Sequence, residues 1–73
     1  MEVLDLHHTS HYKAKILIEE FIILNLDKLP IEIITGNSVD MLEILNKIIS
    51  KYDLSKLPSN FNNLGSYIIT EKI

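Results

Sequence analysis

Two short apolar runs, Val3 to Leu6 and Ile31 to Thr35, each lead directly into a segment of helical length. Short runs made mainly of aliphatic and β-branched residues are typical of buried strands. A strand, a helix and a second strand form a βαβ unit, in which the two strands lie parallel and the crossover is right-handed. The first two thirds of the chain therefore indicate an α/β fold.

The first helix is predicted to follow Thr9 or Ser10, because a hydroxyl there can accept hydrogen bonds from the free N–H groups of the first turn. It should run to about Asn25, since Pro30 disfavours helical geometry in Leu29. Residues at helical spacing form its predicted buried face: Ala14, Leu17, Ile18, Phe21 and Leu24.

Gly36 turns the chain after the second run, and Asn37 or Ser38 is expected to cap a second helix that ends near Tyr52. This is the clearest amphipathic segment of the chain. Its apolar arc holds Met41, Leu42, Ile44, Leu45, Ile48, Ile49 and Tyr52, and its polar arc holds Asp40, Glu43, Asn46, Lys47, Ser50 and Lys51.

The last third predicts a short edge strand in "SKLPS", a polar loop in "NFNNLG" and a closing strand in "SYIITEKI". Pro58 limits the pairing of the edge strand. With two helices for about four strands, we expect both helices on one face of a mixed four-stranded sheet with the order β-α-β-α-β-β. The 73 residues would form a single two-layer sandwich, residues 1–73, with its other face open.

Composition narrows the function. A net charge of −3, with seven lysines and no arginine, argues against strong nonspecific affinity for nucleic acid but allows a local basic patch. The absence of cysteine excludes a disulfide scaffold and a thiolate metal site. The chain shows neither a basic leader nor an apolar run of membrane-spanning length, so we expect a soluble, cytoplasmic protein without a membrane partner.

All three histidines, His7, His8 and His11, lie within "VLDLHHTSHYK", close to Asp5. Residues two apart on a strand point to the same side, so Asp5 and His7 should project together while the adjacent leucines face the helices. A carboxylate orients a neighbouring imidazole and favours its charged form, which suits general acid–base catalysis. A purely structural Asp–His pair at the strand exit is the alternative.

A second candidate site lies in "ITGNSVD", where Gly36, Asn37 and Ser38 lead into a helix. The free N–H groups at a helix N-terminus can bind an anion such as phosphate. An ordinary capped turn explains the same residues, and the early acidic residues Asp40 and Glu43 favour that reading because they would repel phosphate.

The first helix instead opens with His11, Lys13 and Lys15 and has no acidic residue before Glu19. Cations are unfavourable at a helix N-terminus, so these side chains either bind an anion or are simply solvated lysines. We predict no zinc site at the histidines, because Asp5 is the one carboxylate in a fitting place. The cofactor is left open, with a divalent cation among the options.

Ile16 and Ile23 should point away from the apolar face of the first helix, one above the other. Isolated surface isoleucines are common, but this stripe could also mediate a homodimer or contact a protein partner.

Together, "LDLHH", "IEIITGNS" and "GSYIIT" resemble the Smr (small MutS-related) domain, over nearly the whole chain from Val3 to Ile73. That family shows an "LDLHG" strand, a strand ending in "HGKG" or a variant, and a closing "G-x-x-x-V" strand. The resemblance implies a two-layer α/β sandwich, nucleic-acid binding and endonuclease activity on DNA or RNA. It matches Asp5 and His7 to the D-x-H pair tied to cleavage, and Gly36 to the first glycine of the "HGxG" turn.

Three positions depart from the family pattern. Thr35 stands where the family usually has histidine, Ser38 where it often has the second glycine, and His8 where "LDLHG" has glycine. Losing an imidazole at Thr35 removes a group for proton transfer or phosphate binding, for which His8 or His11 could substitute. Two hypotheses follow: an Smr-like endonuclease that cleaves or nicks RNA or DNA, and a noncatalytic Smr-like module that binds nucleic acid or protein.

Overall fold

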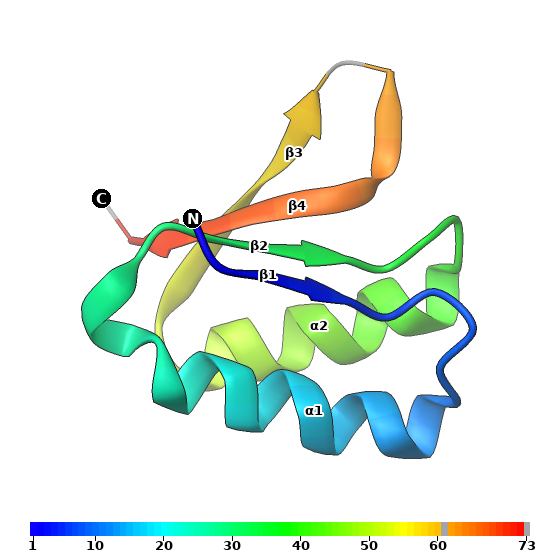
Figure 1. Ribbon diagram of the computed structural model, residues 1–73, viewed down its shortest axis with the longest axis horizontal. Coiled ribbons are helices and arrows are strands. Elements are labelled where there is room, and N and C mark those ends of the chain that lie inside the picture. The colour runs from blue at the N-terminus through cyan, green and yellow to red at the C-terminus, as the bar shows by residue number, and fades with distance from the viewer. Residues whose placement is uncertain (61, 73) are drawn as a thin grey trace.

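A computed structural model describes residues 1–60 and 62–72 and has two layers, a four-stranded sheet and two helices that both cover one of its faces (Figure 1). This confirms the predicted α/β class and the arrangement of the sandwich. The elements in chain order are β1 (Val3–Asp5), α1 (His11–Leu24), the short 3-10 helix η1 (Leu26–Lys28), β2 (Ile31–Ile34), α2 (Val39–Lys51), β3 (Leu54–Asn60) and β4 (Asn63–Glu71).

The sheet is mixed, with the strand order β1-β2-β4-β3. β1 and β2 are parallel, with Asp5 opposite Ile34. β4 lies antiparallel to β2 on one side and to β3 on the other, with Ile34 opposite Ser66. The last strand of the chain therefore lies inside the sheet, and β1 forms an edge.

Both helices begin at a serine cap, one of the two residues predicted in each case. Ser10 Oγ accepts a hydrogen bond from the N–H of Lys13 at 3.3 Å, and Ser38 Oγ accepts one from the N–H of Met41 at 3.1 Å. The core lies between the sheet and the two helices. Both helices and the strands β2, β3 and β4 contribute to it, and so does Leu6, which directly follows β1. Its residues are Leu6, Ala14, Ile18, Ile22, Ile31, Ile33, Met41, Leu45, Ile48, Ile49, Leu54, Tyr67 and Ile69.

The predicted buried face of α1 was wrong at Leu24, which is 68% exposed, and it omitted Ile22, which is fully buried. Because α1 is apolar on nearly every side, its spacing alone did not fix which side faces the sheet.

The last third of the chain is more regular than expected. β3 is longer than the predicted edge strand, and β4 begins inside the predicted loop. Pro58 is accommodated because β3 is an edge strand with a register shift between Pro58 and Asn60. Phe61 of the predicted loop and Ile73 of the predicted strand lie outside the described residues. Among the described residues, none of the helices has the length and the apolar character that a membrane-spanning segment requires.

Candidate functional site

The carboxyl ends of β1 and β2, the N-termini of both helices and the start of β4 all lie at one edge of the molecule, on the right in Figure 1. α/β sheets generally hold ligands outside the carboxyl ends of their parallel strands. The two predicted sites, one after β1 and the other after β2, are therefore neighbours in space.

Asp5 and His7 form a hydrogen-bonded pair just beyond β1. Asp5 Oδ1 accepts the backbone N–H of His7 at 3.1 Å and lies 2.5 Å from His7 Nδ1. Both side chains are about half exposed. Because an ionised carboxylate can only accept, this geometry places a proton on Nδ1 and leaves Nε2 for other chemistry.

The hydrogen bond from the His7 side chain, followed by the one from its backbone N–H, lowers the pKa of Asp5 below its usual value. Asp5 is therefore ionised throughout the neutral range, where it can hold the imidazole in one orientation. The predicted proximity of carboxylate and imidazole is present, and both groups are open to solvent.

His8 takes a left-handed backbone conformation, with φ of 66°. Its ring centroid lies 4.6 Å from that of His7, with the rings tilted by 59°. The position that is glycine in the Smr pattern is thus one where this chain needs a positive φ, which histidine tolerates better than most residues.

The other residues predicted to bind an anion lie further along the same edge. His11 is the first residue of α1, and Lys13 and Lys15 follow on its exposed surface. The structure shows no contact that joins them to the Asp5–His7 pair. Among residues 1–60 and 62–72, no group of three or more His, Asp or Glu side chains is placed to hold a metal ion.

Gly36 directly adjoins the pair. It has φ of +70°, and a β-carbon placed on it would lie 3.9 Å from His7 Cβ. Its N–H, however, donates to the carbonyl of Gly65 at 3.0 Å, as the N–H of Thr35 does at 2.8 Å. The remaining donors for an anion at this corner are N–H groups at the start of α2, after Asn37 and Ser38, which lack partners within the helix. The N–H of Met41 is not among them, because it donates to Ser38 Oγ.

Thr35 does not supply the missing imidazole chemistry. It is buried, and its hydroxyl donates to the Gly36 carbonyl at 2.9 Å, with the Gly65 carbonyl at 3.3 Å. The side chain therefore stabilises the turn from inside and presents no group to a ligand.

Gly65 lies within the motif "GSYIIT", but no local pattern in the sequence indicates its role. A β-carbon on Gly65 would lie 3.0 Å from the carbonyl carbon of Gly36 and 3.1 Å from its oxygen. The start of β4 thus packs directly on the β2–α2 turn, which a side chain at residue 65 would push away. Residues 36 and 65 are distant in sequence, so only an alignment of related chains could have linked them.

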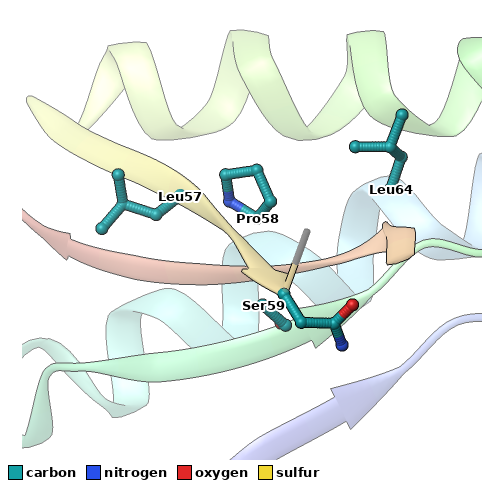
Figure 2. Close-up of a pocket in the computed structure, with 5 residues that line it drawn as sticks. Leu57, Pro58, Ser59 and Leu64 are labelled. Carbon is teal, nitrogen blue, oxygen red and sulfur yellow. The ribbon is translucent and has the colours of Figure 1, made fainter. Parts of the chain in front are cut away.

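Two pockets flank this corner. One, of about 250 Å³, is formed at the start of α2 by Gly36, Asn37, Ser38, Val39, Leu42, Leu64 and Tyr67. The other, of about 400 Å³, is lined by Leu57, Pro58, Ser59, Asn60 and Leu64. Figure 2 shows Pro58 and Leu64 on the same side of the strands, with Ser59 turned to the other. Because Leu64 lines both pockets, an apolar surface adjoins the N-terminus of α2.

On the open face of the sheet, Glu32 ties β2 to the two strands beyond it. Its Oε2 accepts from Ser66 Oγ at 2.5 Å and from Ser59 Oγ at 2.8 Å, and these hydrogen bonds lower the pKa of Glu32. The network braces the sheet beside Ile34, the strand partner of Asp5.

No family model, no curated protein and no solved structure matches this chain. The Smr resemblance therefore rests on the residues and motifs described above.

Proposed function

We propose that this chain is a minimal Smr-like endonuclease that cleaves or nicks RNA or DNA. The observation that carries the proposal is the solvent-open Asp5–His7 pair, which lies at the end of a parallel strand and beside the Gly36 turn. Smr domains have the D-x-H pair at this place. A cytoplasmic location, where nucleic acid is accessible, is part of the proposal.

In this mechanism Asp5 holds the Nδ1 proton of His7, and Nε2 moves the proton of the reaction. Nε2 either activates a water molecule or a ribose hydroxyl as general base, or protonates the leaving oxygen as general acid. First-turn N–H groups of α2, beside Gly36, Asn37 and Ser38, hold the scissile phosphate. Lys13 and Lys15 add positive charge along the same edge, which His8 and His11 also line.

His7→Ala tests the assignment. General acid–base catalysis contributes about 10²–10⁴-fold, so cleavage should fall by that factor while the fold stays intact. Asp5→Asn should lower activity as well, because it removes the charge that orients the imidazole. Lys47→Ala, on the outward face of α2, is the control and should cleave like the wild type.

The assay should use single-stranded RNA, duplex DNA and branched DNA, each with and without divalent metal, at low salt. The metal arm decides whether a divalent cation is needed. Cleavage by folded His7→Ala at the wild-type rate would remove His7 from the reaction and refute the proposal.

A noncatalytic Smr-like module that binds nucleic acid or protein is the second candidate. Two observations favour it: Thr35 is buried with its hydroxyl engaged, and the N–H of Gly36 is already bonded to Gly65. This candidate predicts salt-dependent binding of nucleic acid, or binding of a protein, without cleavage by the wild type under any metal condition.

A further inference from the structure

The outward face of α1 carries an apolar stripe. Tyr12 is 82% exposed, Ile16 49% and Ile23 52%, and at about 100° per residue the three lie within a narrow arc opposite the sheet. The outward face of α2 has only polar residues along its middle and end: Glu43, Asn46, Lys47, Ser50 and Lys51. Packing within one molecule explains the polar outward face of α2. It does not explain the apolar stripe on the outward face of α1.

The charges of α1 are reversed with respect to its dipole. The helix has no acidic residue in its first turn and no basic residue in its last turn. Lys13 and Lys15 lie in its N-terminal half, whereas Glu19 and Glu20 lie in its C-terminal half. Isolated helices are stabilised by the opposite distribution.

Only part of this arrangement is compensated within the molecule. Glu19 accepts from Lys51 Nζ at 2.5 Å and from the hydroxyl of Tyr52 at 2.7 Å, which ties α1 to α2. The ion pairs among the described residues involve neither Lys13 nor Glu20. Both border the apolar stripe on the same side of the helix.

We infer that α1 packs antiparallel against α1 of a second copy of this chain. In that arrangement Lys13 of each copy lies opposite Glu20 of the other, Tyr12 lies opposite Ile23, and the two Ile16 side chains meet near the two-fold axis. The reversed charges become favourable, because the cationic half of each helix faces the acidic half of the other and the two dipoles oppose.

Parallel pairing would place lysine against lysine and glutamate against glutamate, so the charges select the antiparallel orientation. The apolar stripe supplies the affinity, because exposed ion pairs contribute little to it. One helix face is smaller than the roughly 800 Å² that each partner buries in a standard interface, so the dimer is weak and forms at high protein concentration.

Sedimentation across a wide concentration range tests the inference. The wild type should shift from monomer to dimer, and Ile16→Ser/Ile23→Ser should raise the dissociation constant at least about tenfold, because four buried isoleucines are lost. Leu57→Ser is the matched control, since Leu57 is a similarly exposed aliphatic residue on β3. A wild type that stays monomeric throughout, or an equal loss in the control, would overturn the inference.

Charge exchange tests the orientation. Lys13→Glu alone and Glu20→Lys alone each place like charges opposite one another and should weaken the dimer. The double variant exchanges the partners and should recover the wild-type dissociation constant. If it dimerises no better than the single variants, the antiparallel arrangement is wrong.

Discussion

The two strand-to-helix corners at the candidate site have the same backbone plan. β1 leads to α1 through His8, which has φ of 66°, and the cap Ser10. β2 leads to α2 through Gly36, which has φ of 70°, and the cap Ser38. Each corner therefore consists of a strand end, a residue in the left-handed conformation and a serine that begins the helix.

The corners differ in what holds them. The β2–α2 corner is fixed from the side by β4, because Thr35 and Gly36 both donate to the Gly65 carbonyl. The β1–α1 corner belongs to an edge strand, and its polar side chains, Asp5 and His7, pair with each other in solvent. The β1–α1 corner therefore presents exposed acid–base groups, and the β2–α2 corner forms a rigid turn beside them.

Gly65→Ala should give the largest difference in stability between the two corners, because it acts on the β2–α2 corner alone. The added methyl group would meet three backbone atoms of Gly36 at 3.0–3.2 Å, and backbone cannot rotate away. We expect a loss of about 1–3 kcal/mol in unfolding free energy, as for overpacked cores, measured by urea denaturation.

Leu64→Ala is the control for this substitution. Its exposed side chain lies next to residue 65 but outside the contact, so it should change stability by less than about 0.5 kcal/mol. Backbone amide NMR shifts should move around residues 34–38 in Gly65→Ala. Equal stability of the Gly65→Ala and Leu64→Ala proteins would show that β4 does not brace the β2–α2 corner.

The same contrast explains what the sequence could predict. The features that the sequence predicts are local. The spacing of residues on a strand places Asp5 and His7 on one side, and the hydroxyl residues before the helices identify the caps. Gly36 was recognisable because a strand and a helix meet there. These features depend on neighbours within a few residues, which the sequence displays directly.

The rest depends on contacts between distant segments. The tie from Gly65 to Gly36 and the burial of Thr35 arise only once β4 has inserted beside β2. The buried side of α1 was misassigned at Leu24 because the helix carries aliphatic residues on nearly every side. Only contact with the sheet determines that Ile22 is buried and Leu24 is exposed. Residues in long-range contacts carry no local signal of their role.

Substituting the residue with positive φ at each corner should give the next largest effect. The change in unfolding free energy should have opposite signs at the two corners. Gly36→Ala forces a side chain into a conformation that costs about 1–2 kcal/mol, so it should destabilise the fold by that amount. His8→Gly removes the same kind of strain but adds entropy to the unfolded chain, so a gain of up to about 1 kcal/mol is expected.

Thermal and urea unfolding of the two variants measure this pair of changes. His8→Gly also leaves Asp5 and His7 in place, so cleavage that persists in it would assign His8 no part in the reaction. A destabilised His8→Gly protein would mean that the contact between the rings of His7 and His8 outweighs the backbone strain.

Changing the charge in the first turn of each helix should give the smallest effect on stability. The effect should again have opposite signs at the two corners. Lys13→Glu places an acid three residues after the cap Ser10, where it suits the dipole and can accept a hydrogen bond from the Ser10 N–H. Asp40→Lys makes the reverse change in the first turn of α2. We expect a gain of about 0.3–1 kcal/mol for the first and a similar loss for the second.

These measurements belong at low protein concentration and low salt, where the copies are separate and the charges are least screened. Lys13→Glu would then stabilise the monomer while it weakens self-association, two results that a merely solvated lysine would not produce together. If Lys13→Glu instead destabilised the dilute protein, Lys13 would have a favourable partner within its own molecule, and the antiparallel dimer would no longer be needed to explain the reversed charges of α1.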